Sequence, residues 1–187
     1  MLINIVVPIL LIIFIIDYTT KKYVFFAKLK PSAKIPSKSK ENAGYDIYPN
    51  FKEDCIVIPP HKTKMIPTGI ASAFSNRYYF QLEERGSTGT KGIGQRCGVI
   101  DSGFRGEWQV PITNHNDEWM VIAKEGVTFK EIYGDVMPHS FIYPYEKAIS
   151  QAVLLPVPRV KIKELAYKDI LKIKSERGLG KLGSTNK

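Results

Sequence analysis

Short runs of β-forming residues, separated by prolines and glycines, fill most of this chain and limit what it can fold into. The clearest runs lie at residues 23–29, 54–58, 63–67, 78–82, 107–113, 152–157 and 160–165. No long amphipathic helix stands between them, and the best helical segment is a weak one at 163–173. Strands at this spacing are typical of all-β barrels and sandwiches. The sequence therefore predicts an all-β fold.

Composition narrows the function classes. The 187 residues, 44% of them hydrophobic, suit one folded domain with a short appendage. Two cysteines are too few for a disulfide scaffold, and three scattered histidines do not form a zinc motif. The formal net charge of +9 favours a polyanionic partner, which is a nucleotide, a nucleic acid or an anionic membrane surface.

The N-terminal segment, residues 1–22, differs from the rest. Residues 2–16 are apolar apart from Asn4, yet shorter than a full membrane span. We expect a short membrane anchor, with the following lysines holding the folded domain in the cytoplasm. A buried apolar arm and a mis-assigned start codon are the alternatives. Residues 115–145 are aromatic-rich and loosely patterned, which predicts an extra hairpin or excursion that turns at Gly126 and Gly134.

Glycine-rich clusters carry the chemical information. In the cluster at 84–94, glycines allow a close backbone approach to an anion, while Arg85 and Lys91 supply charge and Ser87 and Thr88 supply hydroxyls. An ordinary turn between strands is the alternative. The cluster at 98–108 places Asp101 at a tight turn, where a carboxylate can orient water as a general base or simply stabilise the turn. The cluster at 177–187 is either a disordered tail or a flap that closes on phosphates.

In this order, the clusters resemble the trimeric dUTP pyrophosphatase (dUTPase) family over residues 43–187, with 115–145 unmatched. The matching motifs are N-A-G-Y-D at 42–46, R-G-S at 85–87, G-V-I-D-S-G-F-R-G-E at 98–107, A-I-S-Q at 148–151 and the glycine-rich end at 177–186. The motif at 98–107 is the most specific. The resemblance implies a β-clip, or distorted jelly-roll, domain at 23–175 and a C-terminal flap at 176–187.

The implied activity is hydrolysis of dUTP to dUMP and pyrophosphate at the α-phosphate, in a homotrimer with shared active sites. Asp101 would be the general base, and Mg²⁺ would be held mainly by the phosphates, with Asp46 acting through water. The hairpin backbone would read the uracil edge, and Phe104 would pack under the deoxyribose. Phosphates would contact Arg85, Ser87 and Thr88 of a neighbouring subunit. The implied substrate-binding set is Arg85, Gly86, Ser87, Thr88, Gln95, Gly98, Val99, Phe104, Gln151, Arg177, Leu182, Gly183, Ser184 and Thr185.

Several positions depart from the family pattern. Phe104 replaces a tyrosine and keeps its packing surface, whereas Gly86 replaces a serine, so one phosphate contact is missing or shifts to Ser87. Gln95 stands where many members have a base-reading asparagine. Lys181 and Leu182 replace a glycine and a phenylalanine; Leu182 recovers only part of the stacking on the base and Lys181 adds attraction to phosphate, which predicts a weaker flap.

Three other functions remain open on the sequence alone. A dCTP deaminase shares the fold, but its catalytic glutamate corresponds to Pro111, which cannot transfer protons. A non-catalytic, membrane-tethered nucleotide sensor or partner-binding protein is compatible with the altered tail and the apolar segment. Nucleic-acid binding through the surplus of lysines lacks a recognisable motif, so we expect no specific nucleic-acid partner.

Overall fold

The computed structural model describes residues 23–127 and 139–180, together with Pro8 and Ile12. The chain divides into two units after Val157, and each is described separately. Within the described ranges, regular structure is almost entirely β, which confirms the predicted all-β class. The strands are β1 (Val24–Lys28), β2 (Gly44–Ile47), β3 (Cys55–Ile58), β4 (Thr63–Pro67), β5 (Ile70–Phe74), β6 (Tyr78–Glu83), β7 (Ile93–Gln95), β8 (Val99–Ile100), β9 (Gln109–Asn114), β10 (Trp119–Ala123), β11 (Ser140–Pro144) and β12 (Ser150–Pro156).

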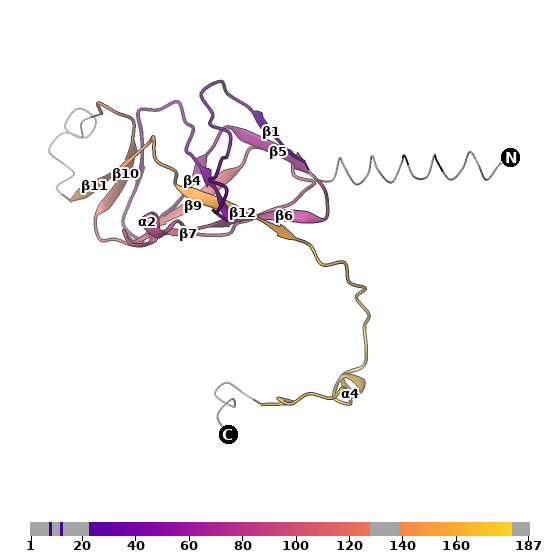
Figure 1. Ribbon diagram of the computed structural model, residues 1–187. Coiled ribbons are helices and arrows are strands. Elements are labelled where there is room, and N and C mark those ends of the chain that lie inside the picture. Colours follow the sequence, from indigo (N-terminus) through magenta and orange to yellow (C-terminus); the bar gives the residue numbers. More distant parts are fainter. Residues whose placement is uncertain (1–7, 9–11, 13–22, 128–138, 181–187) are drawn as a thin grey trace. The chain divides into compact units, whose positions relative to one another are not determined.

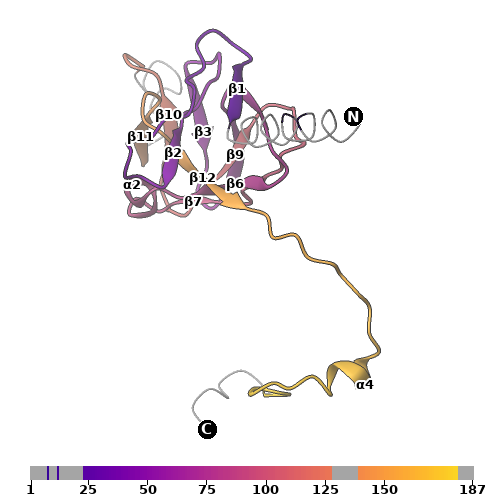
Figure 2. The ribbon, with the colours of Figure 1, turned by 45° about the vertical axis from the view of Figure 1, so that its right-hand side comes forward.

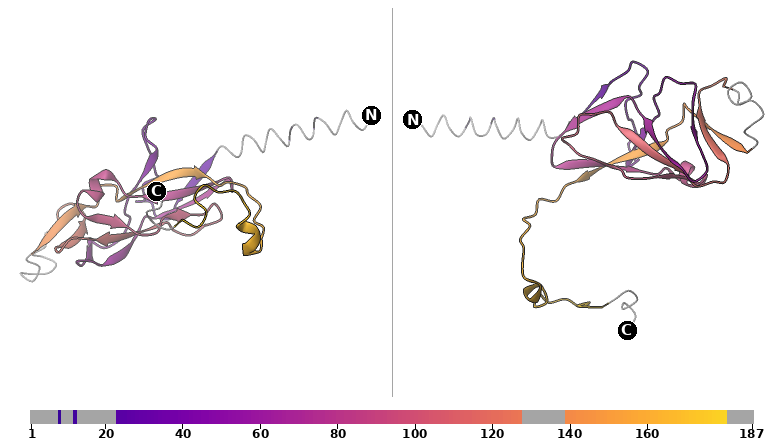
Figure 3. Two further views of the ribbon diagram at one scale, coloured as in Figure 1. Left: turned by 90° about the horizontal axis from the view of Figure 1, so that it is seen from below. Right: turned by 180° about the vertical axis from the view of Figure 1, so that it is seen from behind.

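Four small sheets surround one interior in the first unit (Figure 1, Figure 2). Their strand orders are β1-β5, β11-β10-β3, β2-β12-β6-β8 and β4-β9-β7. Figure 3 shows the same body from below and from behind. Almost all pairs are antiparallel and join strands distant in sequence, such as β2 with β12. Segments from the two ends of the unit therefore meet in one sheet.

The core receives apolar side chains from all four sheets. Trp108 is fully buried at its centre, and its ring meets those of Phe26 and Phe80 edge-on, with centroids 5.5 and 5.2 Å away. The Trp108 indole N–H donates to the buried Ser72 hydroxyl at 3.1 Å, so the ring keeps a hydrogen-bond partner in the interior. This packing fixes the chain at the exit of the 98–108 cluster.

Six of the seven predicted strand runs form strands, but the run at 160–165 does not. That run belongs to the second unit, where Val160 and Ile162 are exposed and make no ladder. A β pattern needs a neighbouring strand to satisfy its backbone groups, and the described part of this unit provides none. The predicted helix at 163–173 shrinks to the single turn of α4 (Tyr167–Ile170).

Of the two forms expected for residues 115–145, an extra hairpin or an excursion, the hairpin is wrong because the strand direction differs. β10 pairs with β11 in parallel, from Trp119 opposite Ser140 to Ala123 opposite Pro144, and pairs with β3 on its other edge. Parallel neighbours need a crossover connection rather than a tight turn, and most of the residues between these two strands lie outside the described part of the chain. The turn expected at Gly126 is present, with φ at 82°, whereas Gly134 lies outside the described residues. Because Met120 and Ile122 are fully buried, this segment forms part of the core.

The predicted membrane anchor at residues 2–16 falls almost entirely outside the described residues. Of the helices that the structure describes, none has both the length and the apolar character needed to cross a bilayer.

Candidate active site

Arg85 stands at the junction between β6 and the single-turn helix α2 (Gly86–Gly89). The turn is closed by Thr88, whose hydroxyl accepts the Arg85 backbone N–H at 3.1 Å and donates to the Arg85 carbonyl at 2.8 Å. Thr88 is buried, and its hydroxyl is used inside the turn. The predicted phosphate contact by its side chain therefore has no geometric support here, and Thr88 acts on the site by shaping the loop.

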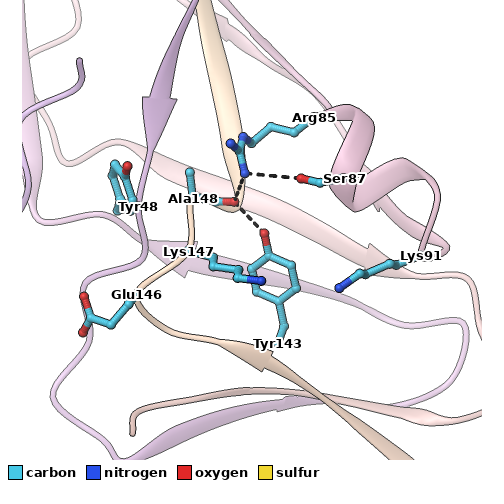
Figure 4. Close-up of a pocket in the computed structure, with 8 residues that line it drawn as sticks. All are labelled: Tyr48, Arg85, Ser87, Lys91, Tyr143, Glu146, Lys147 and Ala148. Carbon is cyan, nitrogen blue, oxygen red and sulfur yellow. Dashed lines mark hydrogen bonds between the residues drawn. The ribbon is translucent and has the colours of Figure 1, made fainter. Parts of the chain in front are cut away.

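The Arg85 side chain joins three segments that are far apart in sequence. Its Nε lies 3.0 Å from Asp46 Oδ1 on β2, while Nη1 donates to the Ala148 carbonyl at 3.1 Å and to Ser87 Oγ at 3.3 Å. Figure 4 shows the contacts of Arg85 with Ala148 and Ser87. A guanidinium held in this way is pre-oriented, and a guanidinium has five N–H donors, which suit the oxygens of a phosphate.

A pocket of about 640 Å³ opens beside this guanidinium. It brings together five of the predicted site residues, which come from β2, the α2 turn and β12. They are Asp46, Arg85, Gly86, Ser87 and Gln151. The Gln151 amide donates to the Glu84 carbonyl at 2.8 Å, which fixes that side chain at the pocket wall. We call this pocket beside Arg85 the phosphate-side pocket.

The turn that carries Asp101 is built by its neighbours. The Phe104 N–H donates to the Asp101 carbonyl at 3.0 Å, and the Arg105 guanidinium donates to the carbonyls of Ser102 and Phe104 at 2.6 and 3.0 Å. Glu107 accepts the Gly69 N–H at 2.7 Å and anchors the far side of the turn. Arg105 and Glu107 were not among the sequence-predicted site residues, although both lie inside the most specific motif.

A second pocket, of about 360 Å³, lies at this turn. The turn does not form the β-hairpin that the resemblance implied, because β8 pairs with β6 whereas β9 pairs with β4 and β7. The pocket keeps the name hairpin pocket below, and its lining includes Val99, Asp101, Phe104 and Met65. Val99, Phe104 and Met65 are exposed apolar side chains, so the pocket offers an apolar surface next to a carboxylate. The Asp101 carboxylate is exposed and has no hydrogen-bond or ionic partner among the described residues. It is therefore free to accept a proton from a bound water.

The Gln95 side chain points into the protein. Its Oε1 accepts the hydroxyl proton of the fully buried Ser150 at 2.5 Å, and its backbone N–H donates to the Glu84 carboxylate at 2.9 Å. A direct contact of the Gln95 amide with a base is therefore not formed in this arrangement. Ser150 and Glu84 were missed by sequence reasoning, since their role depends on the pairing of β12 with β6.

The predicted site residues thus line two different pockets of one chain. The phosphate-side pocket holds Asp46, Arg85, Gly86, Ser87 and Gln151, and the hairpin pocket holds Val99, Asp101 and Phe104. The described part of the C-terminal cluster lies in the second unit, where Arg177 donates to the Gly180 carbonyl at 3.3 Å. Leu182, Gly183, Ser184 and Thr185 lie outside the described residues. Among the residues that are described, no three His, Cys, Asp or Glu side chains cluster in a way that could hold a metal ion.

Comparison with known proteins identifies the family. The dUTPase family profile matches residues 30–126. A deoxyuridine 5'-triphosphate nucleotidohydrolase of Nautilia profundicola is 34% identical over 164 residues, which cover 86% of this chain and 96% of that protein. The chain belongs to the dUTPase family. A dUTPase family member from Candida albicans, with the same descriptive name, is 31% identical over 84% of both chains.

Solved dUTPase structures share the fold. The dUTPase of Staphylococcus bacteriophage 80alpha, solved with dUPNHPP, superposes with a TM-score of 0.66 at 21% identity, covering 88% of this chain and 99% of that one. The structure described as native EIAV dUTPase gives a TM-score of 0.55 at 20% identity, covering 78% of this chain and 98% of that one. At these identities the likeness concerns the fold, which is of the dUTPase type and mostly β.

Proposed function

We propose that this protein hydrolyses dUTP to dUMP and pyrophosphate. Membership of the dUTPase family supports the activity. The observation that carries the proposal is the division of the site: an unpartnered Asp101 stands beside an apolar pocket, and an oriented Arg85 stands beside a polar one. A nucleotide has the same division, because its flat base and its sugar are partly apolar while its triphosphate is anionic.

In the proposed reaction, Asp101 accepts a proton from water while the water oxygen attacks the α-phosphorus. The bond between that phosphorus and the bridging oxygen breaks, and pyrophosphate leaves with the bonding electrons. General-base catalysis of this kind requires a carboxylate free to accept a proton. Phe104 would pack against the deoxyribose, and the backbone of the hairpin, including Gly98 and Val99, would read the uracil.

The phosphates would be bound by Arg85, Ser87 and Gln151 of a neighbouring subunit, because these residues line a different pocket from Asp101 in one chain. This arrangement supports the expected homotrimer with shared sites. The C-terminal segment at 176–187 would close over the phosphates, with Arg177 on the γ-phosphate and with contacts from Leu182, Gly183, Ser184 and Thr185. The proposal includes a β-clip topology for the domain. It also includes a cytoplasmic location, with the N-terminal apolar segment as a membrane anchor.

The side chains present suit a magnesium ion that is carried by the substrate. Asp46 already shares Oδ1 with Arg85, so only its other carboxylate oxygen is available, which fits contact through water. Mg²⁺ prefers phosphate and water oxygens, and when bound it would neutralise charge on the triphosphate. Asp46 would then orient both Arg85 and the water shell of the ion.

The test is pyrophosphate release by the full chain from dUTP, UTP, dCTP and dTTP in parallel, with and without Mg²⁺. We expect selective turnover of dUTP that depends on Mg²⁺. Ammonia release from dCTP, measured in the same reactions, would support the deaminase alternative. A folded protein that binds dUTP without turning it over would be the non-catalytic sensor, and either result would overturn the proposal.

A further inference from the structure

The outer face of β1 carries exposed aromatic side chains. Side chains of a strand alternate between its two faces, and Phe26 points inward, where its ring packs against those of Phe80 and Trp108. On the opposite face stand Tyr23, just before β1, and Phe25, with exposed fractions of 61% and 59%. Their two rings stack on each other, with centroids 6.1 Å apart. Adjacent exposed rings that lie outside the core indicate a contact with something beyond the domain.

The rest of this face is formed by small apolar side chains. In the antiparallel pairing of β1 with β5, Phe25 lies opposite Ala73, and Ala27 lies opposite Ala71. We call Tyr23, Phe25, Ala27 and Ala73 the β1 face. In the described part of the chain β1 pairs with β5 alone. A further strand would join the free edge of β1 and extend the sheet sideways, because strands pair edge to edge, so it would leave the β1 face open.

Positive charge surrounds the β1 face. Residues 18–33 contain four lysines and no acidic residue, and neither β1 nor β5 contains an acidic residue. Lys28 and Lys30, at the end of β1, are exposed, and neither forms an ion pair with another described residue. Arg77 is exposed in the turn that follows β5, beside the start of β1. Basic side chains next to exposed aromatic rings suit the headgroups of anionic lipids.

The position of the β1 face in the sequence also favours a lipid surface. The apolar run at residues 2–16 ends seven positions before Tyr23, and seven residues reach at most about 25 Å. If that run enters a bilayer, as proposed for it above, the β1 face stays within about this distance of the headgroups. A tether of this length raises the local concentration of the face at the membrane, so that even a weak contact is occupied.

We propose that the β1 face lies on the surface of an anionic bilayer. Tyr23 and Phe25 contact the lipids at the level of the headgroups, where amphipathic rings are favoured, and Lys28 and Lys30 contact the lipid phosphates. The contact orients the folded domain on the membrane, while the apolar run anchors it. This inference rests on the proposed membrane location and extends it, and it does not depend on hydrolysis of dUTP.

Quenching of tryptophan fluorescence by brominated lipids tests the proposal in the full chain. Phe25→Trp places a tryptophan on the β1 face. The control, Ile142→Trp, replaces an exposed apolar residue of β11, at the other end of the first unit (Figure 1, Figure 2). The vesicles contain phosphatidylcholine and phosphatidylserine in about a seven-to-three ratio. Emission of the native tryptophans is subtracted with the unaltered protein.

We expect lipid quenching of Phe25→Trp and none of Ile142→Trp. Protein that floats with the vesicles while Phe25→Trp stays unquenched would overturn the proposed contact and leave the anchor in place. Equal quenching of the two variants would also overturn it, because the domain would then have no preferred face. Protein that does not float with the vesicles would overturn the anchor together with the contact. None of these results depends on turnover of dUTP, which is measured without lipid.

A charge variant tests the contribution of the lysines. Lys30→Gln should weaken partition onto the anionic vesicles roughly fivefold, because each lysine near such a surface contributes on that order. Lys147→Gln removes an exposed lysine in the turn after β11 and is the matched control for net charge. Equal weakening by both variants would contradict the proposal. If Phe25→Ser instead dissociates an assembly of the protein in the absence of lipid, the β1 face belongs to a second copy of the chain and the proposal is wrong.

Discussion

Replacing Gly98 by alanine should damage both the fold and the proposed active site. Gly98 begins the segment 98–108 that carries Asp101, which we call the hairpin although its strands pair with other strands, and its φ is +155°. A Cβ at this position would stand 2.6 Å from the Leu82 carbonyl oxygen and 2.8 Å from Gln81 Nε2. The carbonyl belongs to the backbone of β6 and cannot move aside. The hairpin must therefore shift away from β6.

The magnitude follows from two contributions. An alanine forced into an unfavourable φ region costs about 1–3 kcal/mol. Shifting the hairpin also breaks the hydrogen bond of 2.7 Å from the Leu82 N–H to the Gly98 carbonyl, a loss of about 1 kcal/mol. We expect the free energy of unfolding to fall by about 2–4 kcal/mol in total, with a large fall in kcat as Asp101 is displaced.

Urea unfolding followed by circular dichroism measures the stability, and pyrophosphate release measures turnover. Gly103→Ala is the matched control, because it lies in the same hairpin and a Cβ there meets nothing within 4 Å. A Gly98→Ala protein as stable and as active as Gly103→Ala would refute the close approach of the hairpin to β6.

Three further predictions address the surroundings of the site. Ser150→Ala should lower stability by about 1 kcal/mol, since Gln95 loses a buried donor; urea unfolding identical to that of the unaltered protein would show that Gln95 needs no such support. Gly44→Ala should raise the KM for dUTP, because the new Cβ would stand 2.9 Å from Gln151 Cδ and push that side chain from its pocket; an unchanged KM would exclude Gln151 from phosphate binding. Burial raises the pKa of Tyr143 above its ordinary value, so the folded state holds the phenol proton more tightly than the unfolded state, and stability should fall as the pH rises through 10.0 and above. Urea unfolding across that range should show a smaller alkaline loss for Tyr143→Phe, and an equal loss would contradict the assignment.

The sequence predicted the fold class and the chemical motifs because both are local patterns. Runs such as 54–58 and 78–82 carry their β preference in a few residues, and the turn at Asp101 is determined by the glycines and the aspartate within it. The run at 160–165 shows the limit of predicting strands from local patterns. A strand-like pattern forms a strand only when another strand is available to pair with it.

Contacts between distant segments could not be predicted. The inward turn of Gln95 depends on Ser150, which reaches it through the pairing of β12 with β6. The same holds for the ion pair of Asp46 with Arg85. The parallel pairing of β10 and β11 likewise depends on which edge β3 leaves available.

The central claim is that Asp101 and Arg85 of different subunits form one catalytic site. Mixing two inactive variants, Asp101→Asn and Arg85→Ala, tests it most directly, after both are unfolded together and refolded. If subunits mix randomly in trimers with shared sites, about a quarter of the sites receive both native residues, and turnover should return to about that fraction. Mixed protein that stays as inactive as its parents, although the subunits are shown to exchange, would contradict the claim.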